Sequence, residues 1–270
     1  MTFSLDLTSA ATDPVDLHLH TLASDGFWTP EQLIAHLAEK NFKVAAICDH
    51  DSQRSVPAAM MLGAGHGVAV IPGVEMTTSW NDRQWHVLVY GFMPGRTDPA
   101  AAAFRACLDD IAALLRARAE DARDRIVASG RPLPSLEEIR AERPLTPFHV
   151  LSAGIKEGHY KGLKDAAESV VELGGNFTAD LPLKRVIDAA HEAGAICVMA
   201  HPGRSDSVGV MTVADLDRML GEGIQIDGLE AHYRSYSDAQ TSEYRQMAEE
   251  RGLLISCGSD SHAPNVPVDP

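Results

Sequence analysis

Short apolar runs alternate with segments of helical pattern along most of this chain, and the alternation restricts its fold more than any other feature. Such a rhythm is typical of βα units arranged around a mostly parallel sheet. The first helical segment opens with Thr29 as a cap and Pro30 in the first turn. The expected strands are 15–19, 44–48, 68–71, 86–92, 196–200, 224–230 and 253–257. The sequence therefore predicts an α/β fold.

The alternation stops between about residues 97 and 180. Here Phe104, Leu108, Ile111 and Leu115 recur near helical spacing, which predicts a long amphipathic helix that ends at Gly130. Shorter helical pieces follow it. We expect one α/β domain built from 14–96 and 181–270, with an inserted helical subdomain over 97–180.

Ionisable residues gather where the expected strands end. In parallel α/β barrels the carboxyl ends of the strands meet at one mouth, which is where active sites form. Six separate segments would deliver imidazoles or carboxylates to that place. Their residues are His18, His20 and Asp25; Asp49, His50 and Asp51; Glu75; His201; Glu230 and His232; and Asp260 and His262.

The first of these segments reads LHLHTLASDG. In an extended strand His18 and His20 share one face, and Leu17 and Leu19 share the other. Taken alone, the segment is either a half-buried strand with a polar face or part of a metal site. So many His, Asp and Glu side chains in one cleft would repel each other and lose hydration unless cations compensated. Mixed imidazole and carboxylate ligands suit zinc, manganese or iron better than calcium.

Composition narrows the possible partners. With 38 acidic and 23 basic residues the formal net charge is −15, which disfavours broad binding to nucleic-acid backbones or anionic membranes. The beginning of the sequence has no signal-peptide pattern, and no run approaches the roughly 20 apolar residues of a membrane span. The widely spaced cysteines suit reduced thiols, and we expect a cytoplasmic protein. For His36, His66, His159 and His191 we expect surface or supporting roles. His86 follows the turn-like NDRQ, so residues 75–80 and 85–92 could form a hairpin, but its ligation stays undecided by position alone.

Taken together, the motifs resemble the PHP superfamily, the polymerase and histidinol phosphatase metallophosphoesterases. The resemblance runs in order from residue 16 to residue 264. Its pieces are HLHTLASDG, ICDHDS, IPGVEM, HVLVYGF, MAHPG, GLEAHY and CGSDSHAP. The inserted helices and Asp25 are typical of a nucleotide-phosphatase branch that acts on 3′,5′-bisphosphonucleosides or trims the 5′ ends of short RNAs. The resemblance implies a distorted (β/α)7 barrel.

The resemblance also implies a set of metal ligands for two to three divalent ions, manganese first and zinc or iron as alternatives. The first ion would be held by His18, His20, Glu75 and Asp260. Glu75 would bridge to a second ion held by His86 and His201, and a third would be held by Asp25, His50 and His262.

Substrate roles follow from the resemblance for four further residues, His149, Arg204, His232 and Arg234. The branch usually has an Arg-Pro-His run where this chain reads Thr146-Pro147-Phe148-His149, so the matching arginine is missing. We expect hydrolysis of nucleotide phosphomonoesters by a metal-bridging hydroxide, with His232, or Asp51 behind it, protonating the leaving group. The expected partner is a small phosphorylated substrate, without a membrane or a stable nucleic-acid complex.

Two other functions remain open from the sequence. An amidohydrolase-type metal-dependent hydrolase also begins its barrel with HxH, but the closing DSH pair and Glu75 fit it less well. A non-catalytic metal-binding accessory module is the other alternative. Assays of phosphomonoester against amide or lactone turnover separate these possibilities.

Overall fold

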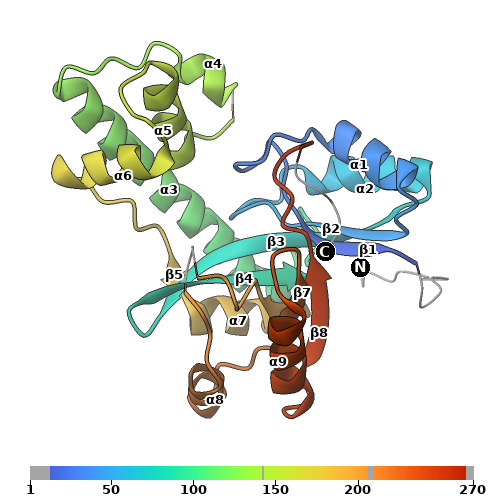
Figure 1. The fold of residues 1–270 in the computed structure, drawn as a ribbon. Helices are drawn as coiled ribbons and strands as arrows, with labels where there is room; N and C mark the ends of the chain where they lie inside the picture. Colours follow the sequence, from blue (N-terminus) through green and yellow to red (C-terminus); the bar gives the residue numbers. More distant parts are fainter. Residues whose placement is uncertain (1–12, 142, 206–208, 266–270) are drawn as a thin grey trace. The chain divides into compact units, whose positions relative to one another are not determined.

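A nearly closed, barrel-shaped sheet forms the frame of this protein in a computed structural model, which describes residues 13–141, 143–205 and 209–265 (Figure 1). The strands follow the order β1-β2-β3-β4-β6-β7-β8, and β5 pairs with β3. The two ends of this path meet, because Leu19 forms a parallel bridge with Ser261. The amide of Asp260 also donates to the carbonyl of His18 at 2.8 Å. The seven strands on this path confirm the predicted distorted barrel.

The strands match the expected ones closely at some places and differ at others. Their bounds are β1 Val15–Leu19, β2 Val44–Ile47, β3 Ala69–Trp80, β4 Arg83–Tyr90, β5 Leu181–Pro182, β6 Ile196–Met199, β7 Gly228–Tyr233 and β8 Leu254–Gly258. All pairs on the path are parallel except those of β4, which runs antiparallel to both β3 and β6. This reversed strand is what distorts the barrel.

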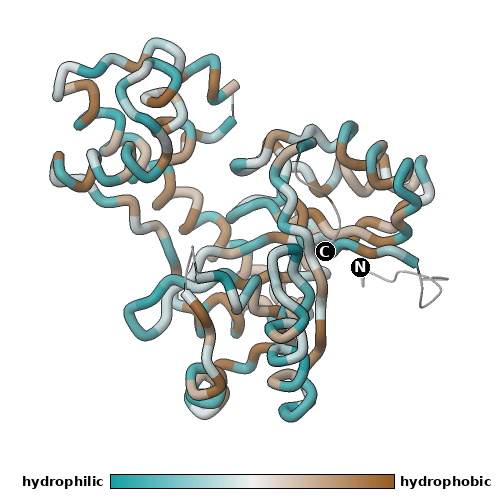
Figure 2. The backbone as a smooth tube through the Cα atoms, viewed as in Figure 1, coloured by the Kyte–Doolittle hydropathy of each residue, from teal (hydrophilic) through white to brown (hydrophobic). Residues whose placement is uncertain are grey.

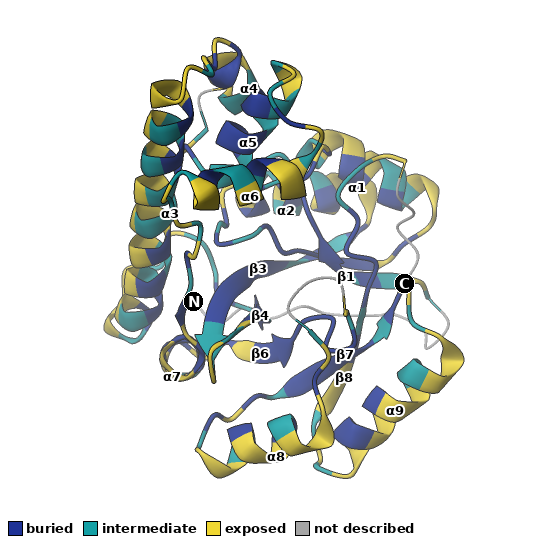
Figure 3. Ribbon diagram, turned by 60° about the vertical axis from the view of Figure 1, so that its left-hand side comes forward, coloured by how far each residue is buried: buried dark blue, intermediate teal, exposed yellow. Residues whose placement is uncertain are grey.

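Helices cover the outside of this sheet. Those of the first unit are α1 Pro30–Glu39, α2 Val56–His66, α7 Leu183–Glu192, α8 Val213–Gly221 and α9 Asp238–Glu249. Thr29 caps α1 by accepting from the amide of Gln32, as the sequence predicts. Leu33, Ile34 and Leu37 then form a buried face against the sheet. Figure 3 shows the result: β3 and β7 are mostly buried, whereas α8 and α9 keep exposed outer faces.

A bulge in β1 changes the alternation predicted for the LHLH segment. Asp16 pairs with Ala45, but Leu19 pairs with Ile47, so β1 contains one residue more than β2 over this stretch. Leu17 consequently packs with the residues inside the barrel, and Leu19 packs with α1 and α2 outside it. The expectation that the two leucines share a face was therefore wrong, because the extra residue shifts the pleat.

The hairpin of β3 and β4 agrees with the one that residues 75–80 and 85–92 allow, but the length of β3 is a second departure. The sequence ends the third strand at residue 71, but β3 continues through Pro72-Gly73 to Trp80. Asn81 and Asp82, both with positive φ, make the tight turn into β4. Glu75 therefore lies in the middle of a strand rather than in a loop. The strand expected over 224–230 is also displaced. The observed strand β7 begins at Gly228 and ends at Tyr233, so Glu230 and His232 lie inside it.

Residues Asp109–Asp180 form a second compact unit. The division falls within α3 Ala102–Ala128, which begins after the short 3₁₀ helix η1 Pro99–Ala101. The other helices are α4 Leu136–Arg140, α5 Pro147–Lys156 and α6 Leu163–Glu172. Hydrophobic and hydrophilic residues are interspersed along α3 (Figure 2). Its apolar side packs Ala119, Ala122 and Ile126 against Val150 and Val170. Within the described ranges, no helix is both long and apolar enough to cross a membrane.

Candidate metal centre

The structure brings the nine predicted metal ligands together at one end of the barrel. Most of them follow the carboxyl ends of the parallel strands, as expected for such a fold. His86 comes from the reversed strand β4 and pairs across the hairpin with Thr77, close to Glu75 of β3. The nine residues are His18, His20, Asp25, His50, Glu75, His86, His201, Asp260 and His262.

Glu75 lies at the centre of this cluster. Its Oε2 atom is 3.1 Å from His18 Nε2, 3.2 Å from His20 Nε2 and 3.3 Å from His50 Nδ1. Its Oε1 atom is 3.0 Å from His86 Nδ1 and 2.9 Å from His201 Nε2. The carboxylate is fully buried, so five imidazole nitrogens crowd one anion without access to water. One side chain thus joins two separate sets of donors.

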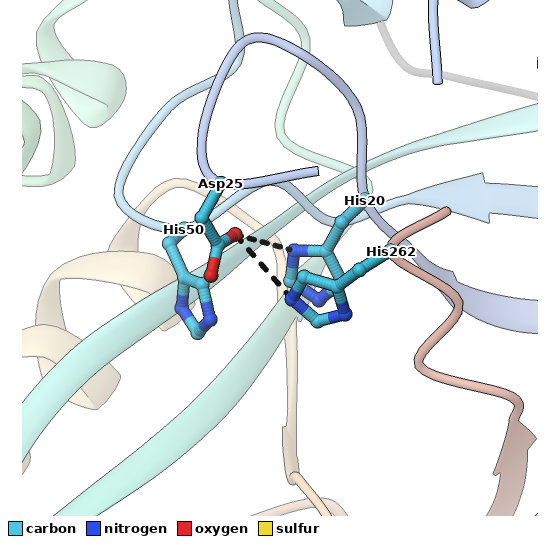
Figure 4. A group of neighbouring side chains, drawn as sticks. All are labelled: His20, Asp25, His50 and His262. Atoms are coloured by element: carbon cyan, nitrogen blue, oxygen red, sulfur yellow. Dashed lines mark ion pairs between the residues drawn. The ribbon is translucent and has the colours of Figure 1, made fainter. Parts of the chain in front are cut away.

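Three overlapping groups in the cluster have donor atoms within 4.8 Å of one another. The groups are His18, His20, Glu75 and Asp260; His50, Glu75 and His86; and His20, Asp25, His50 and His262. Figure 4 shows the last group, with Asp25 facing His20 and His262. The first group is the set that the resemblance implies for one ion. The other two groups differ from the sets that the resemblance implies. His20 and His50 each belong to two of the three groups, and His201 belongs to none of them but contacts Glu75.

The protonation of the cluster shows that it needs positive charge. Burial opposes the ionisation of Glu75, but His50, His18 and His86 outweigh it and hold the pKa of this carboxyl well below its usual range. Burial likewise opposes a charge on His20, yet the nearby carboxylates of Asp260 and Glu75 raise its pKa to about 10. Without cations, protons on His18 and His20, whose pKa values are raised, offset part of the carboxylate charge. Divalent ions would supply the same charge and release those protons.

The donor atoms also fit cations better than they fit each other. His20 Nε2 lies 3.1 Å from Asp260 Oδ1 and 3.2 Å from Glu75 Oε2, yet neither ring nitrogen of this buried residue has a well-formed hydrogen bond in the described part of the chain. A ring nitrogen facing two carboxylate oxygens is a typical ligand arrangement for zinc, manganese or iron. We conclude that these residues fit a group of divalent ions.

Two of the nine residues adopt unusual backbone conformations. His201 has φ +29° and Asp260 has φ +52°, a region that side chains other than glycine rarely occupy. Each such residue costs on the order of 1–3 kcal/mol and persists where the surroundings enforce it. Strain of this kind clusters at functional sites, and here it turns both side chains toward Glu75 and the neighbouring imidazoles.

Glu230 supports the cluster from behind; it was expected near the barrel mouth, without a specific role. Its carboxylate accepts from His18 Nδ1 at 3.0 Å and from the backbone amide of His201 at 2.6 Å. Because a carboxylate can only accept, Nδ1 of His18 donates to Glu230, and Nε2, which faces Glu75, is the nitrogen that would bind an ion after losing its proton. The signal in the sequence was a carboxylate at the end of an expected strand.

Arg204 contacts a predicted ligand. Its Nη1 donates to Asp260 Oδ2 at 2.9 Å, and the hydroxyl of Tyr233 donates to the same oxygen at 2.8 Å. These bonds leave the other oxygen, Oδ1, facing His20. Arg204 therefore has a clear positioning contact besides the substrate role that the resemblance implies.

The side chains of the two predicted proton donors contact other residues than the predicted ligands. A bulge between Glu230 and His232 lets His232 pair with Cys257, and its ring contacts Arg245 of α9 at 3.3 Å. Both carboxylate oxygens of Asp51 accept from Thr77, one from the amide and one from the hydroxyl, each at 2.8 Å. Their assignment as acids therefore remains a prediction from the sequence.

The other two residues with a predicted substrate role, Arg234 and His149, take no part in the contacts among the nine predicted ligands given above. Arg234 is exposed directly after β7. His149 belongs to the second unit, where it is buried at the start of α5 and its Nδ1 accepts from the amide of Thr146 at 3.2 Å. Burial, together with Arg143 and Arg140, lowers the pKa of His149 to about 4. Its substrate role also remains a prediction.

Comparisons with known proteins agree with this geometry. A family model of the PHP domain matches residues 16–174. The 5′-3′ exoribonuclease of Haemophilus influenzae is 28% identical over 266 residues, which cover 94% of this chain and 91% of that protein. The 3′,5′-nucleoside bisphosphate phosphatase of Chromobacterium violaceum is 27% identical over 259 residues, or 93% of this chain and 87% of that protein.

Two solved structures share the fold. A protein of Bifidobacterium adolescentis, provisionally designated a metal-dependent phosphoesterase, superimposes with a TM-score of 0.78 and 24% identity over 96% of this chain and 91% of its own. A Chromobacterium violaceum protein designated an amidohydrolase, with bound sulfate and no metal, gives a TM-score of 0.74 and 26% identity over 94% of this chain and 89% of its own.

Proposed function

The chain belongs to the PHP domain family and is a phosphoesterase, and we propose that it hydrolyses the phosphomonoesters of nucleotides, either 3′,5′-bisphosphonucleosides or short 5′-phosphorylated oligonucleotides. The observation that carries this proposal is Glu75, whose two oxygens face separate sets of imidazoles. A carboxylate in that position can serve two neighbouring cations, which is the arrangement of two-metal phosphoesterases.

The residues divide the work of holding the ions. We propose that His18, His20, Glu75 and Asp260 hold one ion, that His86 and His201 share Glu75 for a second, and that Asp25, His50 and His262 hold a third. When bound, divalent ions supply an activated water and offset the negative charge of the phosphate. Manganese suits this mixed imidazole and carboxylate set, and zinc or iron are alternatives.

The protein's own groups position the reaction. Glu230 orients His18, and Arg204 with Tyr233 orients Asp260, so the donors are fixed before substrate arrives. The resemblance implies substrate contacts for His149, Arg204, His232 and Arg234, and we propose them here. Arginines bind phosphate oxygens in a forked geometry. The two relatives named above act on a nucleoside bisphosphate and on RNA ends, which supports a nucleotide substrate here.

Hydrolysis by the manganese-loaded protein tests this proposal. We expect phosphate release from nucleoside 3′,5′-bisphosphates or short 5′-phosphorylated oligonucleotides, with much lower kcat/KM for simple sugar phosphates. Chelation should abolish turnover and added manganese should restore it. Glu75→Gln, which keeps the shape of the side chain and removes its charge, should be inactive.

The same assay separates the alternatives. Turnover of amides or lactones instead of phosphoesters would assign the chain to amidohydrolase chemistry, the designation of the similar Chromobacterium violaceum structure. A manganese-replete protein that hydrolyses none of these substrates would be a non-catalytic metal-binding module. We expect substrate to be bound transiently, because the net charge of −15 opposes stable binding of long nucleic acids. The free thiols at all four cysteines favour the cytoplasm.

A further inference from the structure

Three potential metal ligands meet at a place away from the catalytic cluster. His191 lies in the last turn of α7, Cys197 is the second residue of β6, and Asp227 directly precedes β7. One donor atom from each lies within 4.8 Å of the others. Cys197 is four residues before His201 on an extended segment, a separation of roughly 13 Å at about 3.3 Å per residue. The two groups of donors are therefore separate.

Backbone hydrogen bonds hold two of these donors in place. The amide of Cys197 donates to Asp227 Oδ2 at 2.7 Å, and the amide of Asp227 donates to the carbonyl of Cys197 at 2.8 Å. His191 is brought to them by the tight turn after α7, where Gly194 has φ +75°. The arrangement is therefore fixed by three rigid elements rather than by mobile side chains.

The spacing of the donors resembles that of the catalytic cluster. His191 Nε2 lies 2.8 Å from Asp227 Oδ2, close to the 2.9–3.3 Å that separate imidazole nitrogens from Glu75. The donor chemistry differs, because this group adds the sulfur of Cys197. Sulfur and imidazole ligands select zinc over manganese, and three protein ligands leave a fourth tetrahedral position for water.

We propose that His191, Cys197 and Asp227 form a separate zinc site that joins the end of α7 to β6 and β7. Cys197 is fully buried, whereas the side chains of His191 and Asp227 are 31% and 35% exposed, so an ion enters from their side. Binding releases the thiol proton, and affinity therefore rises with pH. The bound ion links α7 to β6 and β7, and it takes no part in phosphate hydrolysis.

Cobalt is the sharpest probe of this site, because a cysteine ligand gives Co²⁺ an intense thiolate charge-transfer band in the near ultraviolet. The donor groups of the catalytic cluster in the described residues contain no cysteine. We expect metal-free full-length protein to develop the band when titrated with Co²⁺, and Zn²⁺ to abolish it. Cys197→Ser and His191→Ala should lose the band, whereas the control Cys257→Ser should keep it.

His191→Ala leaves the buried thiol in place and so tests the site even if Cys197→Ser folds poorly. It should also bind one zinc ion fewer than the wild type by elemental analysis. Absence of the band in the wild type, or its survival in Cys197→Ser, would overturn the proposal. The outcome is independent of catalysis, since manganese-dependent phosphate release should be unchanged in His191→Ala.

Discussion

The carboxylate of Glu230 lies 3.0 Å from Nδ1 of His18, and this contact decides which ring nitrogen of His18 faces Glu75. A metal-ligating imidazole usually has such a partner, which fixes its orientation and raises its basicity. Loss of the Glu230 charge should therefore weaken the binding of an ion by His18.

Glu230→Gln should weaken manganese binding or activity by roughly 10- to 100-fold, the usual effect of removing a charged partner of a ligating histidine. Calorimetric titration with manganese and kcat/KM on a nucleoside bisphosphate measure the two effects. Glu222→Gln is the matched control, because Glu222 is an exposed carboxylate paired with Arg218. Equal manganese affinity in the wild type and Glu230→Gln would show that Glu230 does not tune His18.

Gly258→Ala should reduce both stability and activity. A Cβ at this position in β8 would overlap the carboxylate of Glu230 and the Cβ of His18. Overpacking of this kind costs about 1–3 kcal/mol, and here it would also displace two groups of the cluster. Thermal melting and kcat/KM are the measurements. Gly65→Ala should be neutral or stabilising by up to about 1 kcal/mol, because nothing lies near its added methyl in α2. A wild-type melting temperature in Gly258→Ala would contradict the packing described above.

Proton donation to the leaving group can be tested with two substrates. A true acid matters greatly for a nucleotide alkoxide and little for p-nitrophenolate, and its loss costs about 100-fold or more. If the acid predicted from the sequence is correct, His232→Gln or Asp51→Asn should lose activity mainly on the nucleotide. An equal small loss on both substrates would leave these side chains only their contacts with Arg245 and Thr77. A large loss confined to the nucleotide would identify the altered residue as the acid.

His149 should make the protein less stable in mild acid. Burial and two arginines lower its pKa to about 4 in the folded protein, against about 6.5 in the unfolded chain. Between these values the unfolded chain binds a proton that the folded protein does not, so the free energy of unfolding falls as pH falls from about 6.5 to about 4. The total effect is on the order of 2–3 kcal/mol.

Urea unfolding at several pH values, with metal ions removed by a chelator, measures how the free energy of unfolding changes with pH. His149→Gln, whose amide oxygen can still accept from Thr146, should flatten it relative to the wild type, whereas His66→Gln at the exposed end of α2 should not. A slope unchanged by His149→Gln would exclude the buried imidazole as its source.

The βα alternation and the position of the ligands at strand ends could be predicted from sequence because both depend on local patterns. Each short apolar run ends in a polar group, as His201 follows ICVMA, and parallel strands bring such ends together. β1 was predicted with its observed bounds, and the helix capped by Thr29 begins where expected.

Features that depend on pairing between distant segments could not be predicted. Pro72-Gly73 suggested the end of a strand, but pairing with β4 carries β3 nine residues further than predicted, through Trp80. The bulge in β1 exists only relative to β2, and the bulge in β7 that turns His232 to α9 exists only relative to β8. The partner of Glu230 is likewise set by the fold, since 212 positions separate it from His18.

The central place of Glu75 has a consequence for how the enzyme is filled. Two ions that share one carboxylate cannot load independently, because the first to arrive changes the charge that the second meets. Occupancy should then follow a biphasic isotherm in which the second ion binds more weakly than the first. At ion concentrations that fill only the tighter position, most of the protein would hold one ion and be inactive.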